Sequence, residues 1–422
     1  MPMTPRERVL CAVNHREPDR IPVDLGGTRQ SGISAFAYQR LRTHLGLPTR
    51  KPVRVFDIFQ MLAELEPEVT RRFRSDCVAL NRRAVAFGLV NEGWREFRFD
   101  DRLTAEVPGG FDPVREPDGS LVLRRGDEDI GRMPAGGFYF DRLEKYPGAT
   151  HPDLDTWEPP RLSSADLEHY RSEAARLEST DKAVIAALGP PYELFNGIGQ
   201  GGFEAWMLTF GSEPEYVERM YRKLTDAWIE NLEAFHGAVG DRIQILQIAD
   251  DFGTQRAPFL SPRAFRALVM PAYKRGLDWV HQRTSWKVLL HSDGALVPLL
   301  PSIIEMGVDI LNPVQTSAAR MDPGFLKKEF GDHLAFWGGS ADPQTTLEHG
   351  TPARVAEETR RNADILSRGG GFVLASVHNI QATVPAPNIA ALFDAPFTTG
   401  PEAEGCASPG STGPGESRPP GA

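Results

Sequence analysis

Cysteine is scarce in this chain of 422 residues, which contains only Cys11, Cys77 and Cys406. These cysteines lie far apart and form no Cys-x-x-Cys pair, so we expect no disulfide framework and a reducing compartment. Long apolar runs are also absent, and no segment approaches the length of a membrane span. The N-terminus is charged and lacks the apolar core that a signal peptide needs. These absences together predict a soluble, cytoplasmic protein with no membrane partner.

Basic side chains are outnumbered, with 47 Lys and Arg against 57 Asp and Glu and a net charge of −10 at pH 7. Nucleic-acid-binding proteins usually present a basic face, so we expect no nucleic-acid partner. An anionic small molecule is not excluded, because local charge can oppose the total. The sequence also contains no Walker motif, no dinucleotide fingerprint after a strand and no Gly-x-Ser-x-Gly motif.

A repeated strand-and-helix pattern is the most prominent feature that the sequence does have. Short apolar runs each end in a polar cluster and are followed by a helical stretch. The runs are residues 183–188, 243–248, 287–290, 308–311, 334–337 and 372–375. This repetition predicts parallel strands joined by helical crossovers, in a sheet that is covered on both faces. The pattern is typical of a (β/α)8 barrel, in which the residues after each strand line one shared mouth.

The N-terminal part offers further structural signals. Thr4-Pro5-Arg6-Glu7 has the pattern of a capping box with proline at the first helical position, and it predicts a helix. Residues 20–25 are expected to form a strand that ends in two glycines. Residues 34–45 and 58–74 are expected to be helical, with Pro67 interrupting the second helix.

Two segments depart from the repeated pattern. Residues 88–146 are rich in Gly, Pro, Asp and aromatics, and hairpin strands are expected at residues 121–123 and 138–140. We interpret this stretch as a small antiparallel β insertion in a barrel domain of residues 1–397. It would either be a simple appendage or cover the barrel mouth. The tail, residues 398–422, is rich in Gly, Pro and Ser, which predicts disorder because such residues bury little apolar surface.

His291 and Asp293 follow an apolar run with the spacing His-x-Asp. Because alternate residues of a strand point the same way, both side chains are expected to enter the barrel mouth together. Imidazole and carboxylate are a legitimate metal pair, and His378, after the last apolar run, would supply a third ligand. Such a set leaves a position for water or substrate, on which a metal acts as a Lewis acid. The alternative is a hydrogen-bonded His291–Asp293 pair without metal.

Asp250 and Asp251 follow the run 243–248. Adjacent side chains at a strand end alternate in direction, so only one of them is expected to face the mouth. That carboxylate would act as a general base, anchor an N–H-bearing substrate or bind a metal. The alternative is a helix N-cap or an ion pair with Arg256.

Amide side chains gather near the other strand ends. They are Asn196, Gln200, Gln247, Asn312, Gln315 and Gln381. Amides at these places suit neutral hydrogen bonding to a substrate or to ordered water. We therefore expect them to bind substrate, although each one alone is also consistent with a structural role.

A family resemblance is carried by a series of motifs along the chain. They are residues 4–22, 137–141, 247–255, 260–262, 291–294, 307–315, 337–339, 369–375, 378–381, 384–385 and Asn388. Together they resemble the uroporphyrinogen decarboxylase superfamily over roughly residues 3–395. The resemblance implies a (β/α)8 barrel, in agreement with the repeated pattern.

The superfamily has at least two chemistries. One is cofactor-free decarboxylation of the acetate arms of uroporphyrinogen III, and the other is zinc-dependent methyl transfer between corrinoid proteins and thiols or other acceptors. The decarboxylases carry an Arg-Gln-Ala-Gly-Arg segment whose arginines meet substrate carboxylates. The matching residues 24–32 keep Arg29 and Gln30 but lack the second arginine. The sequence is therefore more similar to the corrinoid methyltransferase-like members.

The methyltransferases of the superfamily hold zinc with a His-x-Cys pair and a later cysteine. By position, His291 matches the histidine and Asp293 the first cysteine, and His378 falls at or beside the place of the second. Harder ligands in place of thiolates lower the preference for soft zinc–thiolate chemistry and admit other divalent ions. The resemblance implies a divalent metal here, with zinc as the expected ion.

We therefore expect a metal-assisted methyltransferase that moves a methyl group between a small methylated substrate and a corrinoid protein or other acceptor. The metal would polarise the substrate heteroatom, and Asp250 or Asp251 would orient the substrate or move a proton. The resemblance also implies a corrinoid partner protein and a homodimer. Two alternatives stay open. One is a carboxy-lyase acting on a porphyrinogen or a smaller acid, and the other is a non-catalytic barrel that binds a small molecule or a corrinoid domain.

Overall fold

A parallel sheet forms the centre of the protein, whose computed structural model describes residues 2–48, 51–143, 151–191 and 202–398. The sheet has seven strands in the order β15-β14-β13-β12-β11-β10-β3. They are β3 (Cys77–Leu80), β10 (Ala183–Ala187), β11 (Ile245–Ala249), β12 (Lys287–His291), β13 (Ile310–Asn312), β14 (Ala335–Trp337) and β15 (Phe372–Val373). Each of the six apolar runs of the repeated pattern overlaps one of these strands, so the predicted strand pattern is confirmed.

Val23 closes this sheet into a barrel. It forms parallel bridges to Ser75, just before β3, and to Leu374, just after β15. The Asp24 amide donates to the Leu374 carbonyl at 2.8 Å, and the Asp76 amide donates to the Val23 carbonyl at 2.7 Å. Val23 thus adds one position to the seven strands of the sheet. The predicted (β/α)8 barrel is confirmed.

The barrel interior has an apolar layer below a polar one. The inward apolar cluster includes Cys77, Ile185, Ile245, Leu289, Ile310, Ala335 and Val373. Because strand side chains alternate, Gln247, His291 and Asn312 lie on the same inward face, two residues nearer the carboxyl ends of their strands. The alternation therefore carries polar side chains to the barrel mouth and leaves the floor apolar.

Helix α1 (Pro5–Val13) closes the opposite end of the barrel. Its buried Val9 and Val13 join the inward apolar cluster. The helix begins with the predicted capping box, in which the side chain of Thr4 accepts from the Glu7 amide and that of Glu7 accepts from the Thr4 amide. Site chemistry is therefore confined to the end of the barrel where the strands finish.

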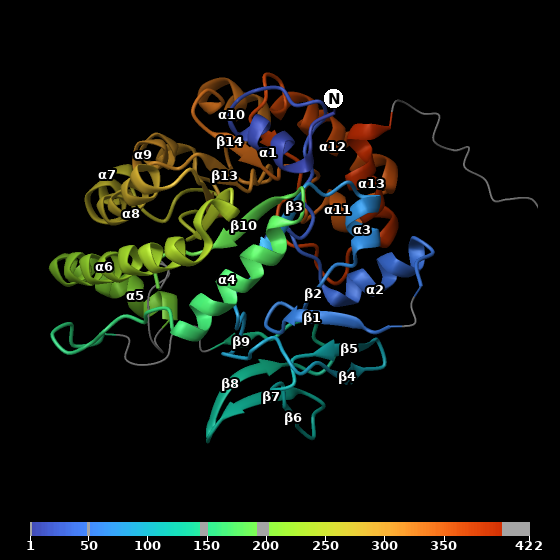
Figure 1. The fold of residues 1–422 in the computed structure, drawn as a ribbon, viewed down its shortest axis with the longest axis horizontal. Coiled ribbons are helices and arrows are strands. Elements are labelled where there is room, and N and C mark those ends of the chain that lie inside the picture. The colour runs from blue at the N-terminus through green and yellow to red at the C-terminus, as the bar shows by residue number, and fades with distance from the viewer. Residues whose placement is uncertain (1, 49–50, 144–150, 192–201, 399–422) are drawn as a thin grey trace, which may run out of the picture.

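The remaining helices lie around the barrel (Figure 1). They are α2 (Ala35–His44), α3 (Pro67–Arg72), α4 (Ser164–Glu178), α5 (Gly202–Ser212), α6 (Pro214–Val239), α7 (Pro262–Ala264), α8 (Met270–Arg283), α9 (Leu300–Met306), α10 (Pro323–Phe330), α11 (Thr346–His349), α12 (Pro352–Leu366) and α13 (Ala386–Asp394). The helix expected over residues 58–74 is wrong in its first half, where the short strand β2 (Leu62–Ala63) forms instead. Met61 has a left-handed φ of 54°, which a right-handed helix does not accept.

Two further sheets lie together in the lower part of Figure 1. One has the order β2-β1-β5-β4 and the other the order β6-β7-β8-β9. Their strands are β1 (Val53–Asp57), β2, β4 (Arg95–Asp100), β5 (Leu103–Val107), β6 (Val114–Arg115), β7 (Leu121–Arg125), β8 (Glu128–Met133) and β9 (Arg142–Leu143). The second sheet is antiparallel throughout, as predicted for the insertion, whereas the first also contains one parallel pair, β1 with β5.

The strand expected at residues 138–140 is wrong, because β7 pairs with β8 instead. Phe138 packs edge-on against Phe36 at a centroid distance of 5.2 Å. Phe140 packs against Phe87 at 5.4 Å and Phe111 at 6.0 Å. These aromatic side chains are used to attach the insertion to the rest of the protein rather than to pair a strand. Among the described residues, no helix is long and apolar enough to cross a membrane.

Candidate functional site

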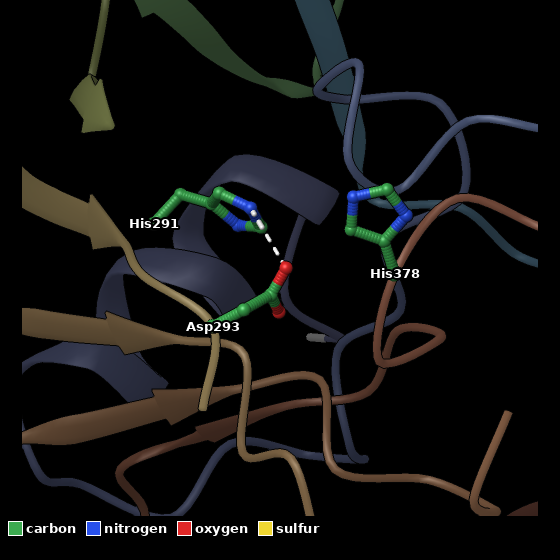
Figure 2. Close-up of side chains that lie close together, drawn as sticks. All are labelled: His291, Asp293 and His378. Atoms are coloured by element: carbon green, nitrogen blue, oxygen red, sulfur yellow. Dashed lines mark ion pairs between the residues drawn. The ribbon is translucent and has the colours of Figure 1, made fainter. Parts of the chain in front are cut away.

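The structure brings His291, Asp293 and His378 together at the barrel mouth. His291 is the last residue of β12, Asp293 follows it, and His378 lies in the segment after β15. One ligand atom from each residue lies within 4.8 Å of the other two. Figure 2 shows the Asp293 carboxylate directed between the two imidazole rings, with 3.8 Å between its Oδ2 and His291 Nε2. The expected ligands are thus close enough to share one ion.

Asn312 fixes which nitrogen of His291 carries the proton. Its Nδ2 donates to the Trp337 carbonyl at 3.1 Å, and its Oδ1 lies 2.7 Å from His291 Nδ1. Because a carbonyl only accepts, the amide nitrogen must face Trp337 and the amide oxygen must face the imidazole. The proton is therefore assigned to Nδ1, which leaves the lone pair of Nε2 toward Asp293. This is the orienting contact that metal-binding histidines usually have.

The backbone that carries Asp293 is held from two sides. Asp251 Oδ1 accepts from the Asp293 amide at 2.9 Å, and Gln315 Oε1 accepts from the Gly294 amide at 2.8 Å. Gly294 has a φ of 94°, and a Cβ there would lie 2.5 Å from the backbone of Gly253. A larger residue would therefore displace the turn and the carboxylate that precedes it.

His378 is kept in its neutral form by its surroundings. Burial lowers the pKa of His378, and the charge that His291 can carry lowers it further. The two rings lie 5.8 Å apart between centroids. The next residue, Asn379, donates from Nδ2 to Gln60 Oε1 at 2.9 Å, which ties this segment to the turn after β1. A neutral imidazole is the form that binds a metal ion.

The three side chains fit a divalent metal ion. Two imidazoles and one carboxylate form a recognised donor set that leaves a coordination position open for substrate. Ligands at about 2.0–2.1 Å from a tetrahedral zinc ion lie roughly 3.3 Å apart. The atoms of His291, Asp293 and His378 are spread over at most 4.8 Å, so small side-chain rotations would bring them to that spacing.

A cavity of about 510 Å³ adjoins the histidines, and its size suits a small molecule. His291 and His378 both line it. Its other walls come from the ends of β10 and β11, from the segments after Val23, β1, β3, β10 and β11, and from the insertion. They include Arg29, Gln30, Phe59, Gln60, Asn81, Arg82, Phe87, Arg125, Ala187, Pro190, Gln247, Asp250 and Asp251.

Asp250 and Asp251 both line the cavity, but their carboxylates have different partners. Asp250 is 1% exposed, and its Oδ2 accepts from the Tyr273 hydroxyl at 2.8 Å. Asp251 supports the Asp293 backbone, as described above. The described residues include no ion pair between either aspartate and Arg256.

The expected substrate-binding amides are divided by the structure. Gln247 lines the cavity, and its Nε2 donates to Gln30 Oε1 at 2.8 Å. Asn312 and Gln315 bind His291 and the Gly294 amide, respectively. Gln381 is exposed, donates to the Asn379 carbonyl at 3.2 Å and is not among the described residues that line the cavity. Asn196 and Gln200 lie outside the described residues.

The sequence analysis missed two residues, namely Arg82, which lines the cavity, and Tyr273, which contacts the cavity residue Asp250. Tyr273 lies in helix α8, and no local signal connects a helical tyrosine with a strand end. Arg82 follows β3, whose apolar run of residues 77–80 was not recognised as a barrel strand. Recognising that run would have pointed to Arg82, because polar residues after barrel strands face the mouth.

Comparisons with known proteins agree with this architecture. The family sequence model described as Uroporphyrinogen decarboxylase (URO-D) matches residues 142–396. No curated protein matches the sequence. A solved structure titled methyltransferase from Methanosarcina mazei is similar, with a TM-score of 0.57, 17% identity, and coverage of 94% of this chain and 98% of that chain. Morphinone reductase in complex with tetrahydroNAD is also matched, with 11% identity and coverage of 58% of this chain and 61% of that chain, but a TM-score of 0.17 carries no argument.

The likeness to the Methanosarcina mazei protein supports the fold over nearly the full length of both chains. The family match covers more than half of the 422 residues, including β12, β15 and the three candidate ligands between and after them. The chain therefore belongs to the uroporphyrinogen decarboxylase family.

Proposed function

We propose that the protein is a metal-assisted methyltransferase, which moves a methyl group between a small methylated substrate and a corrinoid protein or another acceptor. The observation that carries the proposal is the cluster of His291, Asp293 and His378 beside the cavity. The methyltransferase title of the solved structure supports the same class of reaction. The corrinoid partner rests on the sequence resemblance to corrinoid-dependent members of the family.

The three ligands would hold a divalent ion, for which zinc is our first choice. When bound, the ion would act as a Lewis acid on the heteroatom that carries the methyl group. In the direction from substrate to corrinoid, the bond between heteroatom and methyl carbon breaks and the heteroatom keeps its electron pair. A corrinoid acceptor, when bound, would supply the electron pair for the new bond to the methyl carbon from its reduced cobalt.

We assign proton handling to Asp250. A heteroatom that loses its methyl group gains a proton, and Asp250 lies in the cavity wall with the Tyr273 hydroxyl bound to its Oδ2 at 2.8 Å. A carboxyl group that is held in one orientation can give or take a proton without a large reorganisation. Asp251 acts indirectly. Its carboxylate accepts a hydrogen bond from the Asp293 amide and so positions that metal ligand.

A decarboxylase of the porphyrin type is less well supported. The resemblance gives Arg29 the role of meeting substrate carboxylates. In the structure Arg29 is paired with Asp57, with 2.6 Å between Nε and Oδ2, and the Asp57 side chain is fully buried. The charge that would attract a carboxylate is therefore already neutralised.

The proposal can be tested with methylcobalamin as the methyl source and 2-mercaptoethanol or 4-hydroxybenzoate as acceptor. We expect zinc-dependent loss of methylcobalamin, followed by visible absorbance, for the wild type and for the control His349→Ala. His349 is 68% exposed on α11, so its loss leaves the site intact. His291→Ala should reduce the rate to background.

Equal rates for wild type and His291→Ala would contradict the proposal. Metal-independent turnover of uroporphyrinogen III would instead support the decarboxylase. Tight binding of a small molecule or corrinoid domain that persists in His291→Ala, without turnover of any of these compounds, would support the non-catalytic barrel.

A further inference from the structure

Arg82 lines the cavity and has no acidic partner among the described residues. It follows β3 by two residues, and its Nε donates to the Ala187 carbonyl at the end of β10 at 3.4 Å. Both residues line the cavity. In the part of the chain that the structure describes, no carboxylate forms an ion pair with this guanidinium. The contact to Ala187 fixes the inner nitrogen and leaves the terminal nitrogens for another partner.

Arg29, the other arginine discussed above, differs from Arg82 because it forms an ion pair. Both arginines line the same cavity, but the guanidinium of Arg29 contacts the buried carboxylate of Asp57 through two nitrogens. Arg82 therefore supplies positive charge that Arg29 does not. In a chain with a net charge of −10, a cavity arginine that has no acidic partner among the described residues favours an anionic ligand.

The metal ligands and Arg82 lie on different sides of the mouth. Between β3, which precedes Arg82, and β12, which ends at His291, the sheet contains β10 and β11. Strands are spaced by about 4.8 Å, so the two backbones lie roughly 14 Å apart along the sheet and somewhat less across the mouth. The side chains fill part of that distance. A small molecule with its two functional groups at opposite ends would span the remainder.

Aromatic side chains line the cavity as well. Phe59 and Phe87 both line it and pack edge-on, with 6.2 Å between their ring centroids. Phe87 is in turn held by Phe140 of the insertion at 5.4 Å. This wall suits the apolar body of a ligand, in particular a flat ring that can pack against the phenylalanines.

We propose that the small-molecule substrate is an acid, whose carboxylate binds Arg82 and whose methylated end lies at His291, Asp293 and His378. A methylated aromatic acid, such as a methoxybenzoate, has this chemistry. The identity of the reacting end rests on the proposed function. The binding of an anion by Arg82 does not, because it requires neither metal nor methyl transfer.

Calorimetric titration of matched acids and amides tests the inference. The probes are 4-methoxybenzoate and methoxyacetate, each beside its neutral amide, with the wild type, Arg82→Ala, Arg82→Lys and the control Arg83→Ala. Arg83 is not among the described residues that line the cavity. We expect at least one acid to bind the wild type and Arg83→Ala more tightly than its amide. Arg82→Ala should weaken binding of the acid by about 10- to 100-fold and leave binding of the amide unchanged. Arg82→Lys should bind the acid with an affinity between those of the wild type and Arg82→Ala.

The inference is overturned if no acid binds more tightly than its amide, or if Arg82→Ala leaves the preference for the acid unchanged. The same titration with His291→Ala separates this result from the proposed function. If His291→Ala loses the metal but still binds the acid, the result supports both the anion site at Arg82 and the metal site of the proposed function. A wild type that binds the acid through Arg82 but binds no metal supports the anion site and contradicts the methyltransferase.

Discussion

The side chain of Asn312 accepts a hydrogen bond from His291 across 2.7 Å and thereby sets the orientation of the imidazole. Both residues are nearly fully buried, at 3% and 5% exposed, so water does not compete well for this contact. The carbonyl of Trp337 fixes the direction of the Asn312 amide in turn. The metal-facing nitrogen of His291 is thus determined by two successive contacts that lie outside the cavity.

Removal of this contact should weaken metal binding. For Asn312→Ala we expect about a 10- to 100-fold loss of zinc affinity, because the imidazole loses the group that fixes its tautomer and ring orientation. Competition with a chromophoric chelator measures the affinity. Asn312→Asp keeps an acceptor for His291 and should retain more affinity than Asn312→Ala. Unchanged affinity in both variants would show that Asn312 does not position the ligand.

Loss of the Tyr273 hydroxyl should affect turnover more than stability. Tyr273→Phe removes the hydrogen bond to Asp250 but keeps the buried ring, so the free energy of unfolding should fall by only about 1 kcal/mol. We expect kcat to fall while KM changes little. Tyr170→Phe is the control, because Tyr170 is buried against Phe235 and is not among the described residues that line the cavity. Equal kcat values for the two variants would show that the hydrogen bond between Tyr273 and Asp250 has no role in turnover.

The carboxylate of Asp76 should be critical for closing the barrel. It is fully buried and binds Arg8 at 2.7 Å, Arg20 at 2.8 Å and the Val23 amide at 2.9 Å. Asp76→Ala leaves two guanidinium groups without this partner and should lower the free energy of unfolding by roughly 3–5 kcal/mol. Urea denaturation measures the loss. Asp101→Ala, which breaks an exposed ion pair with Arg98, should change stability by less than about 0.5 kcal/mol.

Asp24 should make stability depend on pH. Burial raises the pKa of Asp24 from 3.8 to about 6, although hydrogen bonds from Ser31, Trp337 and Gly27 act in the opposite direction. The stabilisation that protonated Asp24 contributes to the folded state is therefore fully present below pH 4. It is lost as the pH rises through 6, which lowers the free energy of unfolding by an amount on the order of 3 kcal/mol.

Asp24→Asn should flatten this part of the profile. Unfolding by urea between pH 4 and pH 7.5 would compare the slopes of wild type and variant, which separates Asp24 from other titrating groups. Parallel profiles for the two proteins would show that Asp24 does not titrate in this range.

Much of the fold was accessible from the sequence because barrel strands are short apolar runs with polar ends. His291, Asp293 and His378 were found as candidate ligands in this way, since strand ends fix where side chains meet. The helix expected through Met61 and the strand expected at Phe138 were wrong, because a left-handed φ and aromatic packing outweigh local propensity there.

The functions of the amides were less accessible. The position of Asn312 at a strand end is consistent with binding either substrate or His291. Only the 2.7 Å contact in the structure shows that its partner is His291. Tyr273 reaches Asp250 from a helix, which is a tertiary contact with no counterpart in local sequence. Arg82 has no ion pair among the described residues, which depends on tertiary packing and cannot be read from the local sequence.

Metal content is the most direct test of the central claim. Elemental mass spectrometry would compare the wild type, purified without a histidine tag, with His291→Ala and the control His349→Ala. The account predicts a stoichiometric divalent ion in the wild type and in His349→Ala, and its loss in His291→Ala. Absence of metal from all three proteins, even after incubation with zinc, manganese or iron under reducing conditions, would contradict the metal site and with it the proposed methyltransferase.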